Sequence, residues 1–342
     1  MGQAPLTLSQ AADAVDVSIQ NYWLKGTDDQ PEFFKKFTNV TTGVTDYHMK
    51  ESGLSGLGSS SRTVESAAIV AEVPVQLNSQ TYTQVFYDKL MSFSLIMWKF
   101  GIKKRDVQRV VNELKSAGKT RREELLAEKL DAGFVTSYTT SDDAGNYVVT
   151  TSGGDSVAQY SASHTREDGG TAWSNLVSDG TTANLSLDYA ALKALDRVAG
   201  LQVGAKGKTL DVNPNRIVVK KGTAAAHKAK EILGAITSGK IPEEFSNDGS
   251  AVNSFEIVET PYLLATGDAT SPTNLSSATN FHALDTSFIN DQYGIQYFES
   301  QPIQLDEQNV VYKTKEIQYT STVAFAYGHN DARGTFGSTG AN

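Results

Sequence analysis

The segment between residues 81 and 134 constrains the fold most, because it contains a long helical pattern with very little apolar surface. Val107, Val110, Val111 and Leu114 recur with the i, i+3, i+4, i+7 spacing of one helix face, and the residues around them are largely charged or polar. A helix with so narrow an apolar stripe can bury only one side. We therefore expect a long, partly exposed helical backbone of a larger fold.

The same segment also contains signals for a break in the helix. Gly118 is suited to end a helix, and the spacing of Thr120 and Glu123 is that of a capping box, which starts a new one. A helix, a glycine and a second basic helix are also typical of a helix-turn-helix, so DNA binding through residues 103–129 is an alternative function. We assign the aromatic residues between Phe86 and Phe100 to the helix core.

The rest of the chain mixes strand and helix patterns, which indicates the α+β class with long extended arms. Residues 1–43 predict an arm with one or two short helices. Residues 44–78 predict an extended two-stranded hairpin, because a Gly/Ser cluster at 52–61 precedes a partly alternating apolar segment from Val64 to Leu77. Downstream we expect a hairpin turning at Asp142–Asn146, helices at 192–198 and 224–236, and strands at 216–219, at 254–259 and over much of 278–327.

Charge and cysteine content narrow the class of protein. The net charge of −9 argues against a protein whose main task is to coat nucleic acid, and the absence of Cys excludes disulfides and thiolate metal sites. We find no targeting signal and no apolar run that spans a bilayer, so we expect a soluble intracellular chain with no membrane partner. Residues 99–129 carry ten Lys or Arg and five Asp or Glu between two acidic segments. This pattern favours docking between copies, although Lys-rich helices beside Asp-rich loops would also produce it.

No group of residues has the pattern of an active site. The five His residues are far apart and lack metal-ligand spacing, and no phosphate-binding loop or calcium-binding loop is present. Ser163, His164 and Asp168 lie close together in the sequence, but no nucleophile motif surrounds them, so we do not expect a catalytic triad. The sequence predicts no catalytic residues, no metal and no cofactor.

Four short motifs in the C-terminal half follow one another in a characteristic order. They are Ser161-Ala162-Ser163-His164 with Asn175-Leu176, then Ser186 to Leu192, then Asn213-Pro214-Asn215-Arg216 leading into an Ala-rich helix, and finally Gly328 to Ser338 with Asp331, Arg333 and Gly334. In order and spacing they resemble the phage major capsid proteins of the HK97 fold, and are closest to the Mu-like major head subunit branch. The sequence departs from that pattern at Lys220-Lys221, where prolines are often seen, and at Ala332, which replaces an aromatic residue.

The resemblance implies a division of the chain into parts. It implies an N-terminal arm at 1–43 and an extended hairpin loop at 44–78, which reaches over a neighbouring subunit. It also implies a peripheral domain built on a spine helix, at 79–185 and 306–342, and an α/β axial domain at 186–305.

The function that the resemblance implies is structural. Pentamers and hexamers of the chain would close into an icosahedral shell around double-stranded phage DNA, without sequence-specific binding. The implied partners are further copies, a scaffold, a portal and decoration proteins; the implied location is the virion, after assembly in the bacterial cytoplasm. A related alternative is an encapsulin-type shell around an enzyme cargo. We expect assembly contacts at Lys50, Gly56, Arg62, Glu65, Lys103, Lys104, Arg105 and Arg333.

Overall fold

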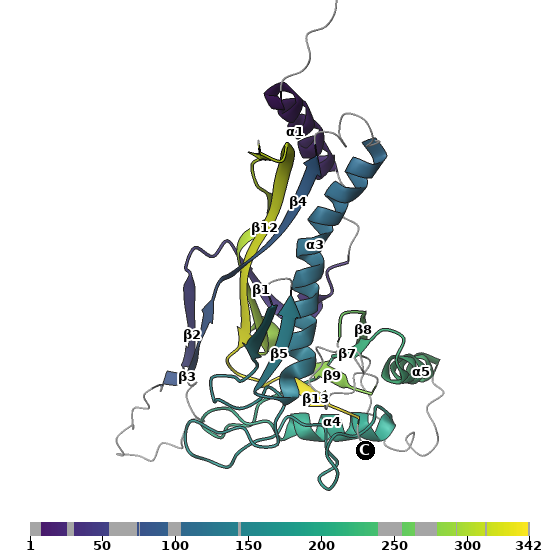
Figure 1. Ribbon diagram of the computed structural model, residues 1–342. Helices are drawn as coiled ribbons and strands as arrows, with labels where there is room; N and C mark the ends of the chain where they lie inside the picture. The colour runs from purple at the N-terminus through teal and green to yellow at the C-terminus, as the bar shows by residue number, and fades with distance from the viewer. Residues whose placement is uncertain are drawn as a thin grey trace, which may run out of the picture.

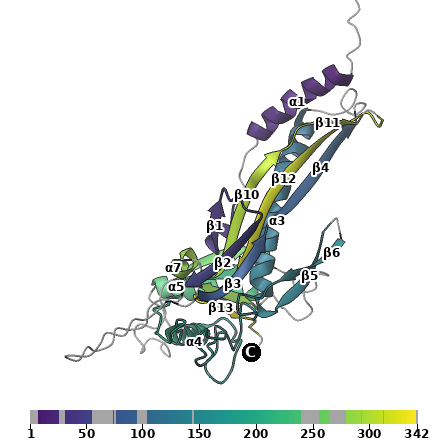
Figure 2. The same ribbon diagram turned by 90° about the vertical axis from the view of Figure 1, so that its left-hand side faces the viewer.

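The computed structural model describes residues 8–25, 31–54, 74, 76–94, 104–142, 145–238, 255–263, 279–291, 293–311 and 313–340. The molecule is elongated. A long helix, α3, lies beside the long strands β4 and β12. The helices α4, α5 and α7 and the short strands β7, β8, β9 and β13 gather at one end, and α1 lies at the other (Figures 1 and 2).

The elongated part is built on a five-stranded sheet in which β12 is central. β4 pairs with one edge of β12 while β10 and β11 pair with the other, all antiparallel, and β1 is parallel to β10. The strands are β1 (Thr38–Thr42), β4 (Val85–Ser94), β10 (Ile295–Leu305), β11 (Asn309–Val311) and β12 (Glu316–His329).

The helix α3 (Lys104–Asp131) covers one face of this sheet with the apolar stripe predicted from the sequence. Val107, Val111 and Leu114 are buried against β4, β12 and α1 (Leu8–Lys25), in a cluster that includes Ile19. The prediction of a long spine-like helix is therefore confirmed.

The predicted break at Gly118 is wrong, because α3 runs without interruption through 28 residues. Gly118 lies where the helix meets the sheet: a Cβ atom there would be 3.4 Å from Ile303 of β10. This distance is ordinary van der Waals contact, so the glycine neither ends the helix nor is required by the packing, and the helix-turn-helix arrangement is absent from this segment.

The assignment of the aromatic run to a helix is also wrong. Residues 85–94 form the strand β4, in which Met91 and Phe93 are buried against Tyr319 and Ile317 while Phe86 and Leu90 are exposed on the other face. This alternation has the period of two that a half-buried strand requires. Trp98 and Phe100 lie outside the described residues.

A second sheet of four strands lies at the compact end, in the order β13-β9-β7-β8. The strands are β7 (Arg216–Lys220), β8 (Glu256–Thr260), β9 (Phe281–Leu284) and β13 (Thr335–Ser338), and the neighbouring helices are α4 (Tyr189–Gly200), α5 (Ala224–Ser238) and α7 (Thr286–Asn290). Apolar residues of α4, α5, β7 and β9 form one buried core. These elements confirm the predicted helices and strands between 192 and 284.

A shared core joins the two sheets. Leu125, Leu126 and Leu130 of α3 pack with residues of both sheets, among them Val218 of β7 and Phe325 of β12. The C-terminal half of α3 therefore holds the elongated and compact parts together.

Two hairpins form separate two-stranded sheets. In the first, β2 (His48–Leu54) pairs with β3 (Gln76–Thr83), which supports the predicted hairpin, although its second strand extends to Thr83; the predicted tip lies outside the described residues. In the second, β5 (Ser137–Asp142) pairs with β6 (Gly145–Thr150), as predicted.

The N-terminal segment is fixed to α3 by charged groups. Arg122 forms ion pairs with Glu32 and Glu299 at 2.5 and 3.1 Å, and its guanidinium lies over the ring of Phe34. Glu123 accepts a hydrogen bond from the backbone N–H of Phe34, the first residue of a short 3-10 helix, η1 (Phe34–Lys36). A second 3-10 helix, η2 (Ala132–Phe134), follows α3.

Strand pairing crosses the predicted domain boundaries. β10 lies inside the predicted axial segment but pairs with β1 and β12, and β13 lies inside the predicted peripheral segment but pairs with β9. The division into arm, hairpin, peripheral and axial domains stays a prediction.

Candidate functional site

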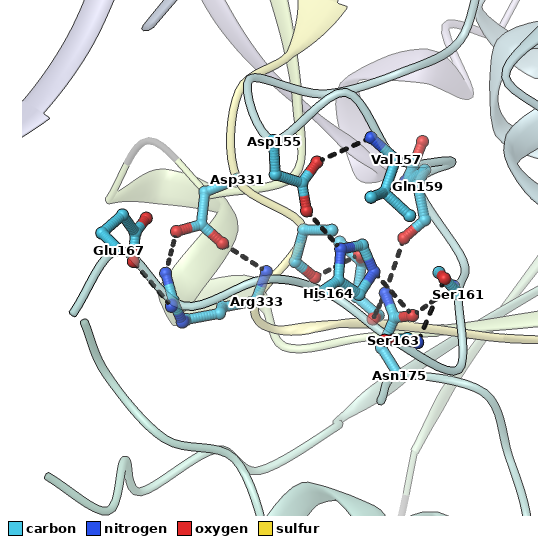
Figure 3. Close-up of polar contacts among 12 residues, drawn as sticks. Asp155, Val157, Gln159, Ser161, Ser163, His164, Glu167, Asn175, Asp331 and Arg333 are labelled. Carbon is cyan, nitrogen blue, oxygen red and sulfur yellow. Dashed lines mark hydrogen bonds and ion pairs between the residues drawn. The ribbon is translucent and has the colours of Figure 1, made fainter. Parts of the chain in front are cut away.

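Two of the four motifs that carried the resemblance, Ser161 to Asn175 and Gly328 to Ser338, meet where the loops between β6 and α4 contact the C-terminal strand β13 (Figure 3). Asn175 is fully buried at the centre of this network. Its side-chain oxygen accepts from the N–H of Ser161 at 2.8 Å and lies 3.2 Å from His164 Nε2. Its amide nitrogen donates to the carbonyl oxygens of Gln159 and Thr335, at 2.6 and 3.0 Å. Asn175 therefore ties the loop to β13.

His164 holds the other side of the loop. Its Nδ1 lies 2.8 Å from Asp155 Oδ2, and its ring stacks on Trp173 with 4.2 Å between the ring centres. The backbones of His164 and Trp173 exchange two hydrogen bonds. The buried imidazole of His164 thus connects the parts of the loop that contain Asp155 and Trp173.

Arg333 links the network to the second half of the chain. Its guanidinium contacts Asp331, lies 3.5 Å from Glu167 and donates to the carbonyl of Val203 at 2.9 Å. It also lies over the ring of Trp173, 5.1 Å from the centre. Burial lowers the pKa of Arg333, but the carboxylates of Asp331 and Glu167 outweigh that effect and hold it above its usual value. The side chain therefore stays charged.

Two glycines of the terminal motif are required by their surroundings. Gly334 has a φ of +80°, which favours glycine. At Gly337 a Cβ atom would lie 2.6 Å from the ring of Tyr160. The small residues of the motif therefore let β13 approach the loops closely.

The arrangement around His164 is not that of a catalytic triad. Asp155 and His164 have the geometry of the acid and base of a catalytic triad, but the second ring nitrogen of His164 faces Asn175 and not a hydroxyl. Asp168 contacts Arg166 instead of His164. Within the described part of the chain, no three His, Asp or Glu residues are placed to hold a metal ion. None of the described helices is long and apolar enough to cross a membrane.

An acidic cavity of about 170 Å³ lies between this network and the β2–β3 hairpin. Its lining includes Glu51, Asp155, Glu167, Asp291 and Asp331, with Arg333 among them. Burial raises the pKa of Glu51, although a hydrogen bond from Tyr82 opposes the effect. Beside the cavity, the side chain of Asn330 donates to the carbonyl of Asn78 in the hairpin at 3.0 Å.

The residues predicted for assembly contacts do not form one cluster. Lys50 is exposed on β2, whereas Arg105 is exposed at the start of α3, at the far end of the elongated part (Figure 1). Arg333 is only 3% exposed and is bound within the chain, so it offers little surface to a neighbouring copy. Outside the described residues or side chains lie Gly56, Arg62, Glu65, Lys103 and Lys104.

The sequence did not point to Asp155, Glu167 or Trp173 as members of the network. Each belongs to irregular loops, in which no periodicity indicates which side chains turn inward. The glycines and polar residues near them indicate loops, but they do not indicate which side chains are buried.

We compared the sequence and the structure with those of known proteins. No family model matches the sequence, and no curated protein is significantly similar to it. The capsid structure of the cyanophage P-SCSP1u superposes with a TM-score of 0.52 at 10% identity, covering 91% of this chain and 89% of that chain. The capsid of an empty GTA particle gives 0.49 at 13% identity over 97% and 98%, and the mature capsid of bacteriophage PhiM1 gives 0.49 at 9% over 91% and 88%.

The cyanophage match extends over most of both chains. This chain therefore has a mixed α/β fold of the kind found in phage capsids. At 10% identity the likeness concerns the fold alone.

Proposed function

We propose that this chain is the major capsid protein of a tailed bacteriophage, with the HK97 fold and closest to the Mu-like branch. The observation that carries the proposal is the fold shared with the cyanophage capsid over 91% of the chain. The convergence of the Ser161–Asn175 and Asp331–Ser338 motifs around Asn175 supports it, because these motifs carried the resemblance in the sequence.

The shape of the subunit suits a shell protein. Two hairpins form separate two-stranded sheets, and β4 exposes Phe86 and Leu90 on one face. Exposed apolar groups of this size are typical of surfaces that other chains cover. In this proposal, pentamers and hexamers close into an icosahedral shell around double-stranded DNA. A scaffold, a portal and decoration proteins take part, and assembly precedes release of the virion from the bacterial cytoplasm. The role is structural, without catalysis.

Sedimentation velocity of the purified chain tests this function directly. We expect particles far larger than the 36.8 kDa subunit. The fraction of the protein found in these particles should increase as the protein concentration rises. A chain that stays monomeric or dimeric at every concentration and salt would contradict the proposal. Enzyme cargo inside the particles, in place of nuclease-protected phage DNA, would assign the same fold to an encapsulin-type shell.

The basic start of α3 is a proposed contact with acidic surfaces of neighbouring copies. Exchange of Lys103, Lys104 and Arg105 for Glu should lower the yield of particles and weaken its dependence on salt. The matched control exchanges Lys206, Lys208 and Lys221 for Glu, with the same change in charge. Equal yields for wild type and the first variant would exclude this contact while leaving the capsid function untouched.

A further inference from the structure

A lysine that has no carboxylate partner among the described residues is buried at the end of α3. Lys129 is 1% exposed, and its amino group donates to the carbonyl of Thr150, at 3.0 Å. Burial alone lowers its pKa to about 7. An amine in such surroundings is strongly disfavoured in its charged form.

A histidine at the end of β12 is in a similar position. His329 is 1% exposed, and within the described part of the chain neither of its ring nitrogens has a hydrogen-bond partner. The backbone of Gly153 lies against the ring, since a Cβ atom there would be 2.9 Å from Nε2. Burial, together with the positive charges of Lys129 and His164, holds the pKa of His329 well below its usual value.

Both groups touch one short segment, residues 150–154. Lys129 binds its first carbonyl, His329 packs on Gly153, and the N–H of Gly154 donates to the carbonyl of Asn330 at 3.0 Å. This segment connects β6 to the loop that carries Asp155. It therefore joins the β5–β6 hairpin to the body of the subunit.

The neighbouring acids are occupied elsewhere. From the loop, Asp155 faces His164, and from α3 the carboxylate of Glu128 accepts from Tyr138 and lies near Arg121. In the described residues, no carboxylate lies within ion-pair distance of Lys129 or His329. A proton taken up by either group thus has no counter-charge beside it.

We propose that protonation of Lys129 and His329 releases residues 150–154 from α3 and β12, so that this junction is a pH-sensitive latch for the β5–β6 hairpin. The inference concerns the single subunit and does not depend on the proposed assembly.

The direction of the effect follows from the pKa values of the closed and open states. Both groups bind protons more weakly when closed, so the open state gains stability relative to the closed state as pH falls. Lys129 alters the opening equilibrium at pH values above its closed-state pKa of about 7. His329 alters it as the pH falls below about 6.5, the usual pKa of histidine. Between pH 8 and pH 5 the opening equilibrium should rise by about a hundredfold, the two groups together.

Hydrogen exchange followed by mass spectrometry measures this opening in the full chain. After correction for the intrinsic pH dependence of exchange, peptides within 145–155 should lose about two orders of magnitude of protection between pH 8 and pH 5. Peptides of α4 serve as the reference, because they contain neither group. Equal changes in both sets of peptides would overturn the proposal.

Single variants separate the two groups. Lys129→Met should abolish the change between pH 8 and pH 7, and His329→Gln should abolish the change between pH 6.5 and pH 5. The exposed His227 on α5 provides the control, since His227→Gln should leave the wild-type profile unaltered. Retention of the full pH dependence in both single variants would contradict the latch.

Discussion

Asn175 is the residue on which the motif network depends most. Exchange to Ala leaves the backbone groups of Ser161, Gln159 and Thr335 without their partner inside the protein. We expect Asn175→Ala to lower the free energy of unfolding by about 3 kcal/mol, since unpaired buried polar groups are strongly unfavourable. Urea denaturation followed by circular dichroism measures this change.

The control for that variant is an exposed asparagine in a strand. Asn309 lies on β11 with only a 3.4 Å contact to Gln318. Asn309→Ala should change the free energy of unfolding by less than about 0.5 kcal/mol. Equal effects of the two variants would show that the buried network does not stabilise the fold.

Glu123 predicts a pH dependence of stability. Burial raises its pKa from 4.5 to about 7, although hydrogen bonds from the backbone of Phe34 and Phe33 and the charge of Arg122 oppose the shift. The folded state therefore binds the proton more tightly than the unfolded state, and stability is lost as pH rises from 4.5 through 7.

Glu123→Gln removes this titration. The variant should be more stable than wild type at pH 8, by about 1–3 kcal/mol, and nearly equal to it at pH 4.5. Thermal unfolding across that range measures the difference, with the half-exposed neighbour Glu124→Gln as the control. A Glu123→Gln variant that is less stable at pH 8 than at pH 4.5, relative to wild type, would contradict the account.

The charged residues that fix α3 had a signal in the sequence. Starting from Val107, the apolar stripe continues at steps of three and four residues through Gly118 to Arg122, Leu125 and Lys129. Charged residues on the buried face of a helix indicate buried ion pairs, or buried amines whose pKa is lowered. The partners in β10 and the N-terminal segment are far away in sequence, so no local pattern identifies them.

At the scale of elements, substitution of Gly118 tests whether α3 is one continuous helix. Gly118→Ala should raise the free energy of unfolding by about 0.5–1 kcal/mol, because glycine in the interior of a helix is less favourable than alanine. The new methyl group would meet Ile303 at 3.4 Å, which is close to ordinary contact. Gly234→Ala in α5, where the added atom meets nothing within 4 Å, provides the matched comparison. A marked loss of stability in Gly118→Ala alone would contradict the prediction, and would mean that the packing against Ile303 does not admit a methyl group.

The two faces of β4 should respond differently to substitution. Met91 is 6% exposed, so Met91→Ala should lower the free energy of unfolding by about 2–4 kcal/mol. Phe86 is 57% exposed, so Phe86→Thr should change it by less than about 0.5 kcal/mol while reducing particle yield, if the face is covered in the shell. Denaturation and sedimentation measure the two effects. Similar losses of stability in both variants would contradict the assigned register.

Sequence patterns predicted α4, α5, β7 and β8 better than they predicted β4 and the helix α3 that follows it. The helices α4 and α5 show a helical period, and the strand β7 is a short apolar run that follows the turn residues Asn213 to Asn215. β4 was misassigned because it precedes a true helix and is rich in aromatic residues, which suit both structures. Its strand form depends on pairing with β12, more than 200 residues later, as the register of Phe86 with Ala324 shows.

At the scale of the whole molecule, one helix holds the two larger sheets together. The core around Leu125 joins them, and the motif network ties β13 to the loops before α4. Identity of 10% with the cyanophage capsid chain means that few individual side chains are shared. What the two structures have in common is the arrangement of elements.

Electron cryo-microscopy of particles formed by the purified chain tests the central claim most directly. The account predicts closed icosahedral shells of pentamers and hexamers, whose subunit density takes α3, the five-stranded sheet and the compact end as described. Particles whose density requires a different fold, or samples that hold only monomers and dimers when sedimentation is run over the same concentrations, would contradict it.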